Sequence, residues 1–142
     1  SWTYLDADDG QVFSAFLASR DADLGAVDQD VSAYMERMDA SPTQAYFATI
    51  AVEEVCGVIL NRAFSTTDGY IQLTIVPHED DTVTLHVRDS ARQFNPFEMN
   101  TDDISLEEGT GLDAIGVKMI KSKAKEFFYR RYAGFNTLVV RV

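Results

Sequence analysis

The segment 41–64, SPTQAYFATIAVEEVCGVILNRAF, constrains the fold most strongly, because apolar residues recur along it at helical spacing. Ser41 is a favoured N-cap residue, and Pro42 suits the first helical position. A helix with one apolar stripe needs a second layer that covers the stripe. The residues that form this stripe are Ala45, Ala48, Val52, Val55, Ile59 and Leu60.

Two pairs of alternating segments predict strands for that second layer. Residues 70–77 and 82–89 alternate apolar with polar residues, and the HEDD loop between them predicts a hairpin. Residues 126–132 and 135–142 predict a second hairpin, which turns at Ala133 and Gly134. Strands that follow each other this closely pair antiparallel.

The remaining segments complete the predicted fold. Helical spacing marks residues 24–38, residues 12–18 fit a strand or a short helix, and residues 93–109 read as a loop. The order predicts an α+β fold, a two-layer sandwich with a mixed, mostly antiparallel sheet of four or five strands and helices on one face. Residues 112–124 predict a helix whose apolar face holds Leu112, Ile115, Met119 and Ile120.

The length of 142 residues fits one domain, 1–142, and Ser1 in place of Met suggests a processed chain or a domain of a longer protein. We expect no membrane span, since we find no apolar run of about 18 residues. The single cysteine, Cys56, excludes an internal disulfide and favours a cytoplasmic setting. In its apolar stretch, Cys56 is expected to pack as a small hydrophobe.

The net charge of −11 is unevenly spread. Residues 1–54 hold 11 acidic and 2 basic residues, whereas residues 55–142 hold 12 and 10. This balance disfavours general nucleic-acid binding. One basic cluster fits either a solvated helix face or a patch that faces an anion or a partner. It comprises Lys118, Lys121, Lys123, Lys125, Arg130 and Arg131.

The segment 107–117, EEGTGLDAIGV, places two glycines before a predicted helix. Glycines there let backbone N–H groups approach an anion, and the helix N-terminus adds positive potential. Thr110 could add a hydroxyl donor, whereas Glu107 and Glu108 would repel phosphate. An ordinary turn explains the same residues, so the motif alone is weak.

Two further segments carry carboxylates at informative positions. In VRDSARQFNPFE, Asp89 ends a strand, where it either caps the next turn or accepts a hydrogen bond from a ligand. In AVEEVCGVIL, either Glu53 or Glu54 must lie close to the apolar stripe, where a carboxylate is costly unless it is paired or used. Such a carboxylate could act as a general base on water, or the pair could belong to a solvated face.

Together the three segments resemble the GHKL ATPase superfamily and, within it, the anti-sigma-factor serine kinases of bacteria. In that family a helix carries E-E-x-x-x-N, a strand ends in Asp before a turn with F-x-P, and G-x-G-L opens a later helix. The matching pieces here read EEVCGV, RDSARQFNP and GTGLDAIGV, and GFNTLVV is similar to the family's closing strands. The resemblance covers residues 24–142 and implies a Bergerat-type ATP-binding fold.

The resemblance implies a role for each matched residue. Glu54 would position or activate water, and Asp89 would accept a hydrogen bond from the adenine amino group. Ala91 would leave room for the purine edge, and Thr137 would support adenine. Residues 97–108 would form a short lid over the phosphates. The phosphate-side loop and the start of its helix would be Gly109, Thr110, Gly111 and Leu112.

The departures from the family pattern concern the metal. The family's magnesium-binding asparagine falls at Val58, which cannot ligate a hard cation. Asn61 would lie about 300° round an ideal helix from Val58, so it does not replace that ligand. Arg62 stands where the family has histidine. The expected cofactor is therefore ATP or ADP, no metal ligand is assigned, and binding of magnesium is in doubt.

Three functions follow from this reading. The first is an ATP-binding regulatory domain with serine/threonine-kinase-like activity toward a protein antagonist. The second is a degenerate pseudo-ATPase that has lost turnover and serves as a protein-interaction module, and the third is a plain interaction domain. A regulatory partner of anti-anti-sigma or sigma-like type and a homodimer are both compatible with the resemblance. The acidic first third of the chain would suit a basic partner.

Overall fold

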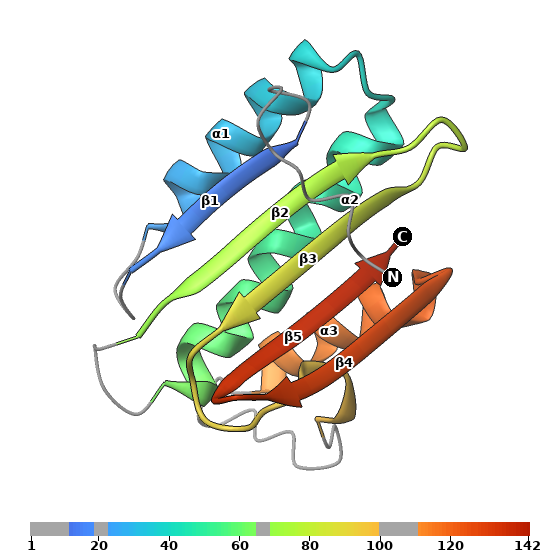
Figure 1. Cartoon of the computed structure of the whole chain (residues 1–142). Coiled ribbons are helices and arrows are strands. Elements are labelled where there is room, and N and C mark those ends of the chain that lie inside the picture. Colours follow the sequence, from blue (N-terminus) through green and yellow to red (C-terminus); the bar gives the residue numbers. More distant parts are fainter. Residues whose placement is uncertain (1–11, 19–22, 65–68, 100–110) are drawn as a thin grey trace.

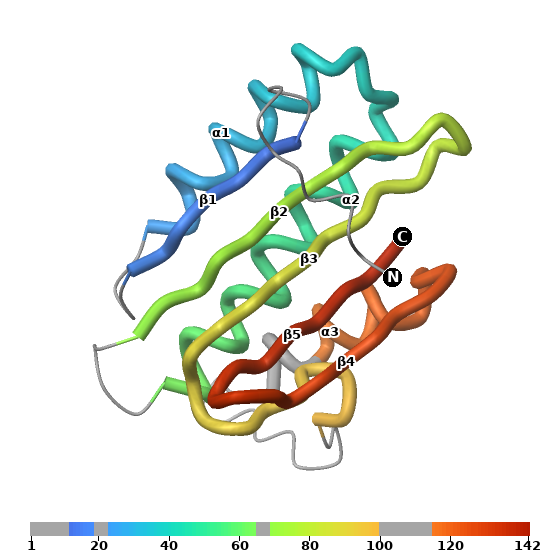
Figure 2. Tube along the Cα trace, viewed as in Figure 1, coloured from blue at the N-terminus to red at the C-terminus, as the bar shows by residue number. Residues whose placement is uncertain are grey.

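The computed structural model describes residues 12–18, 23–64, 69–99 and 111–142, with the backbone alone for 111–114. Five strands form one sheet in the order β1-β2-β3-β5-β4, and the helices lie on one face of it (Figures 1 and 2). The predicted α+β two-layer sandwich is confirmed. The strands are β1 (Phe13–Leu17), β2 (Ile71–Pro77), β3 (Val83–Asp89), β4 (Glu126–Tyr132) and β5 (Phe135–Arg141). The α-helices are α1 (Leu24–Arg37), α2 (Pro42–Ala51) and α3 (Gly111–Lys123).

The long apolar helix begins as its sequence predicts. Ser41 Oγ accepts a hydrogen bond from the Gln44 amide at 3.0 Å, and Gln44 Oε1 accepts one from the Ser41 amide at 3.0 Å. This reciprocal pair is a capping box, and it satisfies two donors that a helix start leaves free.

Beyond α2 the same helix continues through two π turns, η1 (Val52–Cys56) and η2 (Ile59–Ala63), and so reaches the end that the sequence predicts. Each π turn widens the helix locally, and such turns are common at functional sites. The first of them holds both Glu53 and Glu54.

Every strand pairing among the described residues is antiparallel, which corrects the expected mixed sheet. Residues 12–18, for which the sequence predicted either a strand or a short helix, contain the strand β1, which lies at the edge of the sheet and pairs with β2. The pairing that matters most for the site joins β3 to β5, because it places Asp89 directly opposite Asn136.

The core lies between the sheet and the helices. Val52, Val55 and Cys56 are fully buried and face the layer that the sheet supplies. The expectation that Cys56 packs as a small hydrophobic residue is confirmed. Burial raises the pKa of its thiol to about 12. The sheet contributes the buried residues Ile71, Leu73, Ile75, Val83, Leu85, Val87, Leu138 and Val140.

The predicted apolar face of α3 is partly wrong. Ile115 is 49% exposed, whereas Val117 and Ile120 are buried. Val117 and Ile120 are three positions apart and so lie on one side of the helix, about 200° and 140° round from Ile115 at about 100° per residue. Met119 is partly buried and packs against the core.

One helix, Pro42–Ala63, is long and apolar enough to cross a membrane by length and composition alone, contrary to the expectation from the sequence. Half of it is buried inside this domain, however, and the core helix of a two-layer fold passes the same test. Its burial against the sheet accounts for its apolar character.

Candidate functional site

Asp89 ends β3 and is almost fully buried, with 2% of its surface exposed. Its Oδ1 accepts hydrogen bonds from the Ala91 amide at 3.0 Å and from Asn136 Nδ2 at 2.9 Å. Among the described residues, both donors to this carboxylate bind Oδ1 and none binds Oδ2. One oxygen is therefore held in place while the other remains available to accept a hydrogen bond.

Asn136 fixes the corner around that carboxylate. Besides Asp89, its Nδ2 donates to the Arg92 carbonyl at 2.7 Å, and its Oδ1 accepts from the Phe94 amide at 3.3 Å and the Tyr129 hydroxyl at 2.5 Å. These contacts use both donors and both lone pairs of the amide. A single side chain from β5 therefore ties together β3, β4 and the loop that follows β3.

The electrostatic setting of Asp89 follows from its burial. Burial raises the pKa of Asp89 above its usual value, while the hydrogen bonds from Asn136 and Ala91 and the charge of Arg131 oppose the rise. Arg131 Nη1 also donates to the Ala91 carbonyl at 2.8 Å. Since no described residue donates to the second oxygen of this buried carboxylate, that oxygen is suited to an N–H donor from a ligand.

The loop after β3 is anchored at both sides. Arg92 Nη2 donates to the Arg62 carbonyl at 2.9 Å, which ties the loop to the end of the long helix. Farther on, Asn95 Oδ1 accepts from the Phe97 amide at 3.0 Å and caps a short 3-10 turn, η3 (Pro96–Glu98). The F-N-P stretch of the sequence is thus an ordered turn that buries Phe97.

Glu54 lies in η1 and is half-buried, whereas Glu53 beside it is exposed. The carboxyl group of Glu54 rests against α3 at Gly116: a Cβ at position 116 would lie 1.6 Å from Oε2 and 2.1 Å from Cδ. Glycine is therefore required there for Glu54 to hold this position. The expectation that one of the two glutamates lies near the apolar stripe is confirmed, and that residue is Glu54.

Glu53 takes part in a different contact, with Asp28 of α1. Burial and the hydrogen-bonded Glu53 carboxyl raise the pKa of Asp28 to about 7. Its Oδ1 is buried without a hydrogen-bond partner among the described residues. The α1–η1 contact therefore holds a pair of carboxyl groups close together, and it disfavours the state in which both are ionised.

The positions that departed from the magnesium motif differ in burial. Val58 is completely buried in the core, so its side chain faces away from solvent as well as lacking a ligand atom. Asn61 is exposed on η2. Within the described residues there is no cluster of three or more His, Cys, Asp or Glu side chains able to hold a metal.

The structure brings some of the predicted site residues together. Asp89 and Ala91 form one turn, and Ala91 is buried. Gly111 and Leu112 open α3, while Gly109, Thr110 and most of the predicted lid lie outside the described residues. Glu54 reaches α3 four residues beyond Leu112, at Gly116.

Thr137 does not join Asp89. It pairs with Arg88 in β3, and because neighbouring residues in a strand point to opposite faces, it lies on the far side of the sheet from Asp89. Sequence reasoning missed Asn136, one residue earlier. The signal was the strand alternation itself, which would have identified Asn136 once the β3–β5 register was known.

Residues 17–142 match the family model described as "Histidine kinase-like ATPase domain". The chain belongs to this family. Among solved structures, the histidine kinase domain of the blue-light activated histidine kinase from Erythrobacter litoralis EL346 is similar, with 16% sequence identity and a TM-score of 0.48. That match covers 90% of this chain and 64% of the other chain. No curated protein sequence matches the chain.

Proposed function

We propose that the chain is a regulatory domain that binds ATP or ADP through the corner formed by β3 and β5. The observation that carries the proposal is the buried Asp89 carboxylate, which has one oxygen held by Ala91 and Asn136 and no donor to the other among the described residues. Membership of the histidine kinase-like ATPase domain family supports a nucleotide as the ligand.

The chemistry of this corner favours adenine over guanine. The exocyclic amino group of adenine is an N–H donor that suits the unused carboxylate oxygen, and the low exposure of Asp89 makes an unmatched ligand costly. Guanine carries a carbonyl oxygen at the corresponding ring position, so two acceptors would face each other. We therefore expect ADP to bind more tightly than GDP.

The phosphate side would be served by the start of α3. Gly109, Thr110, Gly111 and Leu112 precede or open that helix, whose N-terminus favours an anion. Glu54, held against Gly116 of the same helix, is the candidate for positioning a water or an acceptor hydroxyl. The bound nucleotide would supply the phosphoryl group. A serine/threonine-kinase-like reaction toward a regulatory protein, as in the anti-sigma-factor kinases, is the finer form of this proposal.

A second candidate is a domain that binds nucleotide without turnover, and the burial of Val58 favours it. Phosphoryl transfer depends heavily on a metal that neutralises the developing charge. The two candidates differ in one measurable property: the first requires that magnesium strengthen nucleotide binding, and the second predicts that magnesium has no effect.

The test is a thermal-shift measurement with ATP, ADP and GDP, each with and without magnesium, on the wild type and on Asp89→Asn. A ligand at a hundredfold excess over its dissociation constant stabilises the folded state by about 2.7 kcal/mol. For a domain of this size that corresponds to a rise in Tm of about 8 °C. In Asp89→Asn the amide oxygen can still accept from Ala91 and Asn136, while the new NH₂ group faces the ligand and opposes adenine.

Asp30→Asn is the matched control, because it makes the same chemical change at an exposed position of α1. We expect the ADP shift to persist in Asp30→Asn and to disappear in Asp89→Asn. An equal shift in both variants would remove Asp89 from the site. No shift with any nucleotide would leave the chain as a protein-interaction module.

The proposals about protein partners rest on the family resemblance and on the charge of the chain. The family resemblance supports a regulatory protein partner and a homodimer, and the acidic residues of the first third of the chain would suit a basic surface. Pull-down with charge-reversed α1 variants, including Asp30→Lys, tests the last point. A cytoplasmic location is proposed from the single reduced cysteine.

A further inference from the structure

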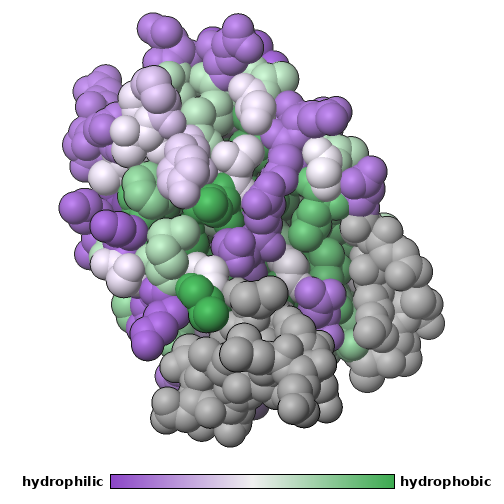
Figure 3. Space-filling view, turned by 180° about the vertical axis from the view of Figure 1, so that it is seen from behind, coloured by the Kyte–Doolittle hydropathy of each residue, from purple (hydrophilic) through white to green (hydrophobic). Residues whose placement is uncertain are grey.

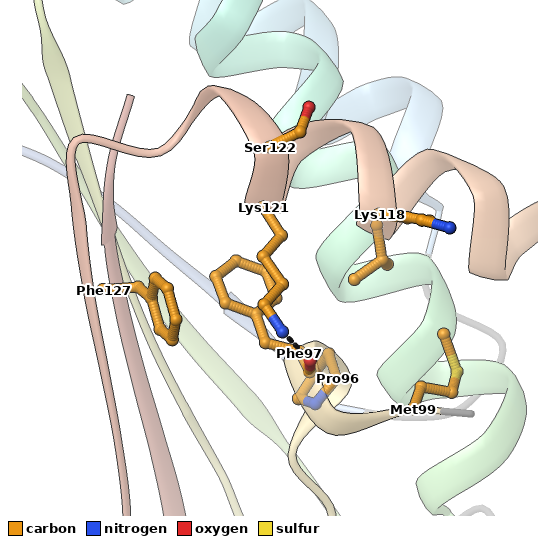
Figure 4. A pocket seen from close by; sticks show the side chains of 8 residues that line it. Pro96, Phe97, Met99, Lys118, Lys121, Ser122 and Phe127 are labelled. Carbon is orange, nitrogen blue, oxygen red and sulfur yellow. Dashed lines mark hydrogen bonds between the residues drawn. The ribbon is translucent and has the colours of Figure 1, made fainter. Parts of the chain in front are cut away.

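A pocket of about 440 Å³ opens between η3, α3 and β4. Its walls are largely apolar: Phe97 and Phe127 face each other edge to face, with ring centroids 5.1 Å apart (Figure 4). Phe127 is 49% exposed although it lies on the helix-side face of β4. The pocket falls within the range of volumes typical of small-molecule sites. Its lining consists of Pro96, Phe97, Met99, Val117, Lys118, Lys121, Ser122 and Phe127.

Positive charge borders this apolar space. Lys121 Nζ donates to the Phe97 carbonyl at 2.8 Å and lies 5.7 Å from the centroid of the Phe127 ring. Lys118 lines the same pocket and has no acidic partner among the described residues. Lys121 thus lies beside the exposed Phe127 ring, and Lys118 lines another part of the same pocket.

Glu98 and Glu126, each next to a pocket residue in the sequence, do not line this pocket. Glu98 belongs to η3 but lines a neighbouring pocket with Gln93, Phe94 and Tyr129. No carboxylate of the described residues lines the pocket that holds the two lysines. Seen from the helix side, the surface shows hydrophobic residues set among hydrophilic ones (Figure 3). Apolar walls and two lysines, with no carboxylate among the described lining residues, suit an amphipathic anion.

The pocket is separate from the nucleotide corner. On α3, Gly116 faces Glu54, and the pocket residues Lys118 and Lys121 lie about 200° and 140° round the helix from Gly116 at about 100° per residue. They therefore occupy the opposite side of the helix. Asp89, Ala91 and Asn136 do not line this pocket either.

We propose that the pocket between η3, α3 and β4 binds a small organic anion with a planar apolar body and one carboxylate. The ring would lie against Phe97 and Phe127, and the carboxylate would reach Lys118. The proposal does not depend on nucleotide binding. Because the pocket and Glu54 lie on opposite sides of one helix, however, such a ligand would act on the element that contacts the nucleotide site.

The experiment is a titration of the ¹⁵N-labelled chain with 2-naphthoate and, separately, with its neutral analogue 2-naphthamide, followed by NMR. We expect naphthoate to shift resonances of η3, α3 and β4, and to bind several-fold more tightly than the amide. Saturating ADP should leave naphthoate binding in place, and so should the Asp89→Asn substitution. Failure of nucleotide binding would therefore not affect this test.

Two variants and two matched controls locate the contacts. Lys118→Gln should weaken naphthoate binding about two- to fivefold, as expected for loss of one exposed ion pair. Lys123→Gln makes the same change on another side of α3 and should leave binding unchanged. Phe127→Ala should weaken binding about tenfold through lost apolar contact, whereas Phe128→Ala, on the other face of β4, should not.

Three outcomes would overturn the proposal: shifts confined to other parts of the chain, equal affinity for the acid and the amide, or displacement of naphthoate by ADP. Equal effects of each variant and its control would do so as well. Retention of the wild-type resonance pattern in Phe127→Ala confirms that the variant is folded. If that pattern is lost, Phe127→Leu, which keeps an apolar side chain but removes the ring, takes its place.

Discussion

Asp89, at the corner of β3 and β5, is held by two hydrogen-bond donors on one oxygen, whereas the Glu54 carboxyl, in the first π turn, rests against Gly116 of α3. The first region is defined by hydrogen bonds that satisfy every polar atom of Asn136. The second is defined by the close fit of the Glu54 carboxyl against Gly116, and by the repulsion between the neighbouring carboxyl groups of Glu53 and Asp28. Substitutions in the corner should therefore lower the free energy of unfolding. Substitutions along the helix should mainly alter the position of the Glu54 side chain and the pH dependence of stability.

The largest effect is expected from Asn136→Ala. This change removes the partners of the Arg92 carbonyl, the Phe94 amide and the Tyr129 hydroxyl, and leaves Asp89 with one donor fewer. Buried polar groups left without partners cost about 3 kcal/mol of unfolding free energy here. Urea denaturation measures it. Thr137→Ala, one residue along on the other face, should cost less than about 1 kcal/mol. Equal losses in both variants would contradict the assigned network.

The same two residues show how far sequence reasoning reaches. Hairpins and helix starts depend on residues that are adjacent in the sequence. Ser41 and Pro42 therefore predict the start of the long helix, and the HEDD loop predicts the hairpin between β2 and β3. The partner of Asp89 is 47 positions away, and its identity depends on the register between β3 and β5. Thr137 was assigned to the site from the family resemblance, and a difference of one residue places it on the opposite face of β5 from Asn136.

For the region around Glu54, the apolar stripe of the long helix was the informative pattern. The apolar stripe placed either Glu53 or Glu54 near the core, and the family resemblance then pointed to Glu54. Gly116, which accommodates Glu54, lies outside 41–64, and nothing in the residue pattern of that segment distinguishes the π turns from an ordinary α-helix. The pocket between Phe97 and Phe127 likewise joins residues 30 positions apart, and no local pattern links them.

A smaller effect is expected from Gly116→Ala, and its sign depends on Glu54. Alanine stabilises a helix by about 1 kcal/mol relative to glycine, but its Cβ would occupy the place of the Glu54 carboxyl. We expect little net change in the wild-type background and a gain of about 1 kcal/mol when Glu54→Ala is also present. A double-mutant cycle in urea measures this coupling. Strict additivity of the two substitutions would show that Gly116 does not position Glu54.

The smallest effect, and the one most dependent on conditions, concerns Asp28. Its folded pKa, about 7, lies above its ordinary value of 3.8. Between these values the folded state keeps a proton that the unfolded state has lost, so stability falls as the pH rises and the penalty is complete above pH 7. Asp28→Asn should therefore stabilise the domain by about 1 kcal/mol at pH 8, after allowance for solvent screening, and have little effect at pH 4.

Thermal unfolding at pH 4 and pH 8 checks this expectation, with Asp30→Asn as the exposed control on the same helix. The difference between the two pH values should shrink in Asp28→Asn and stay unchanged in Asp30→Asn. The same stabilisation at both pH values would exclude the carboxyl pair as its source.

The bond between Asp89 and Asn136 also closes a long stretch of chain that includes η3 and α3. The entropy of closing such a stretch grows only with the logarithm of its length, so doubling it costs about 0.6 kcal/mol. A change in the length of the chain between η3 and α3 would therefore cost little closure entropy, and the β3–β5 register would still place Asn136 opposite Asp89.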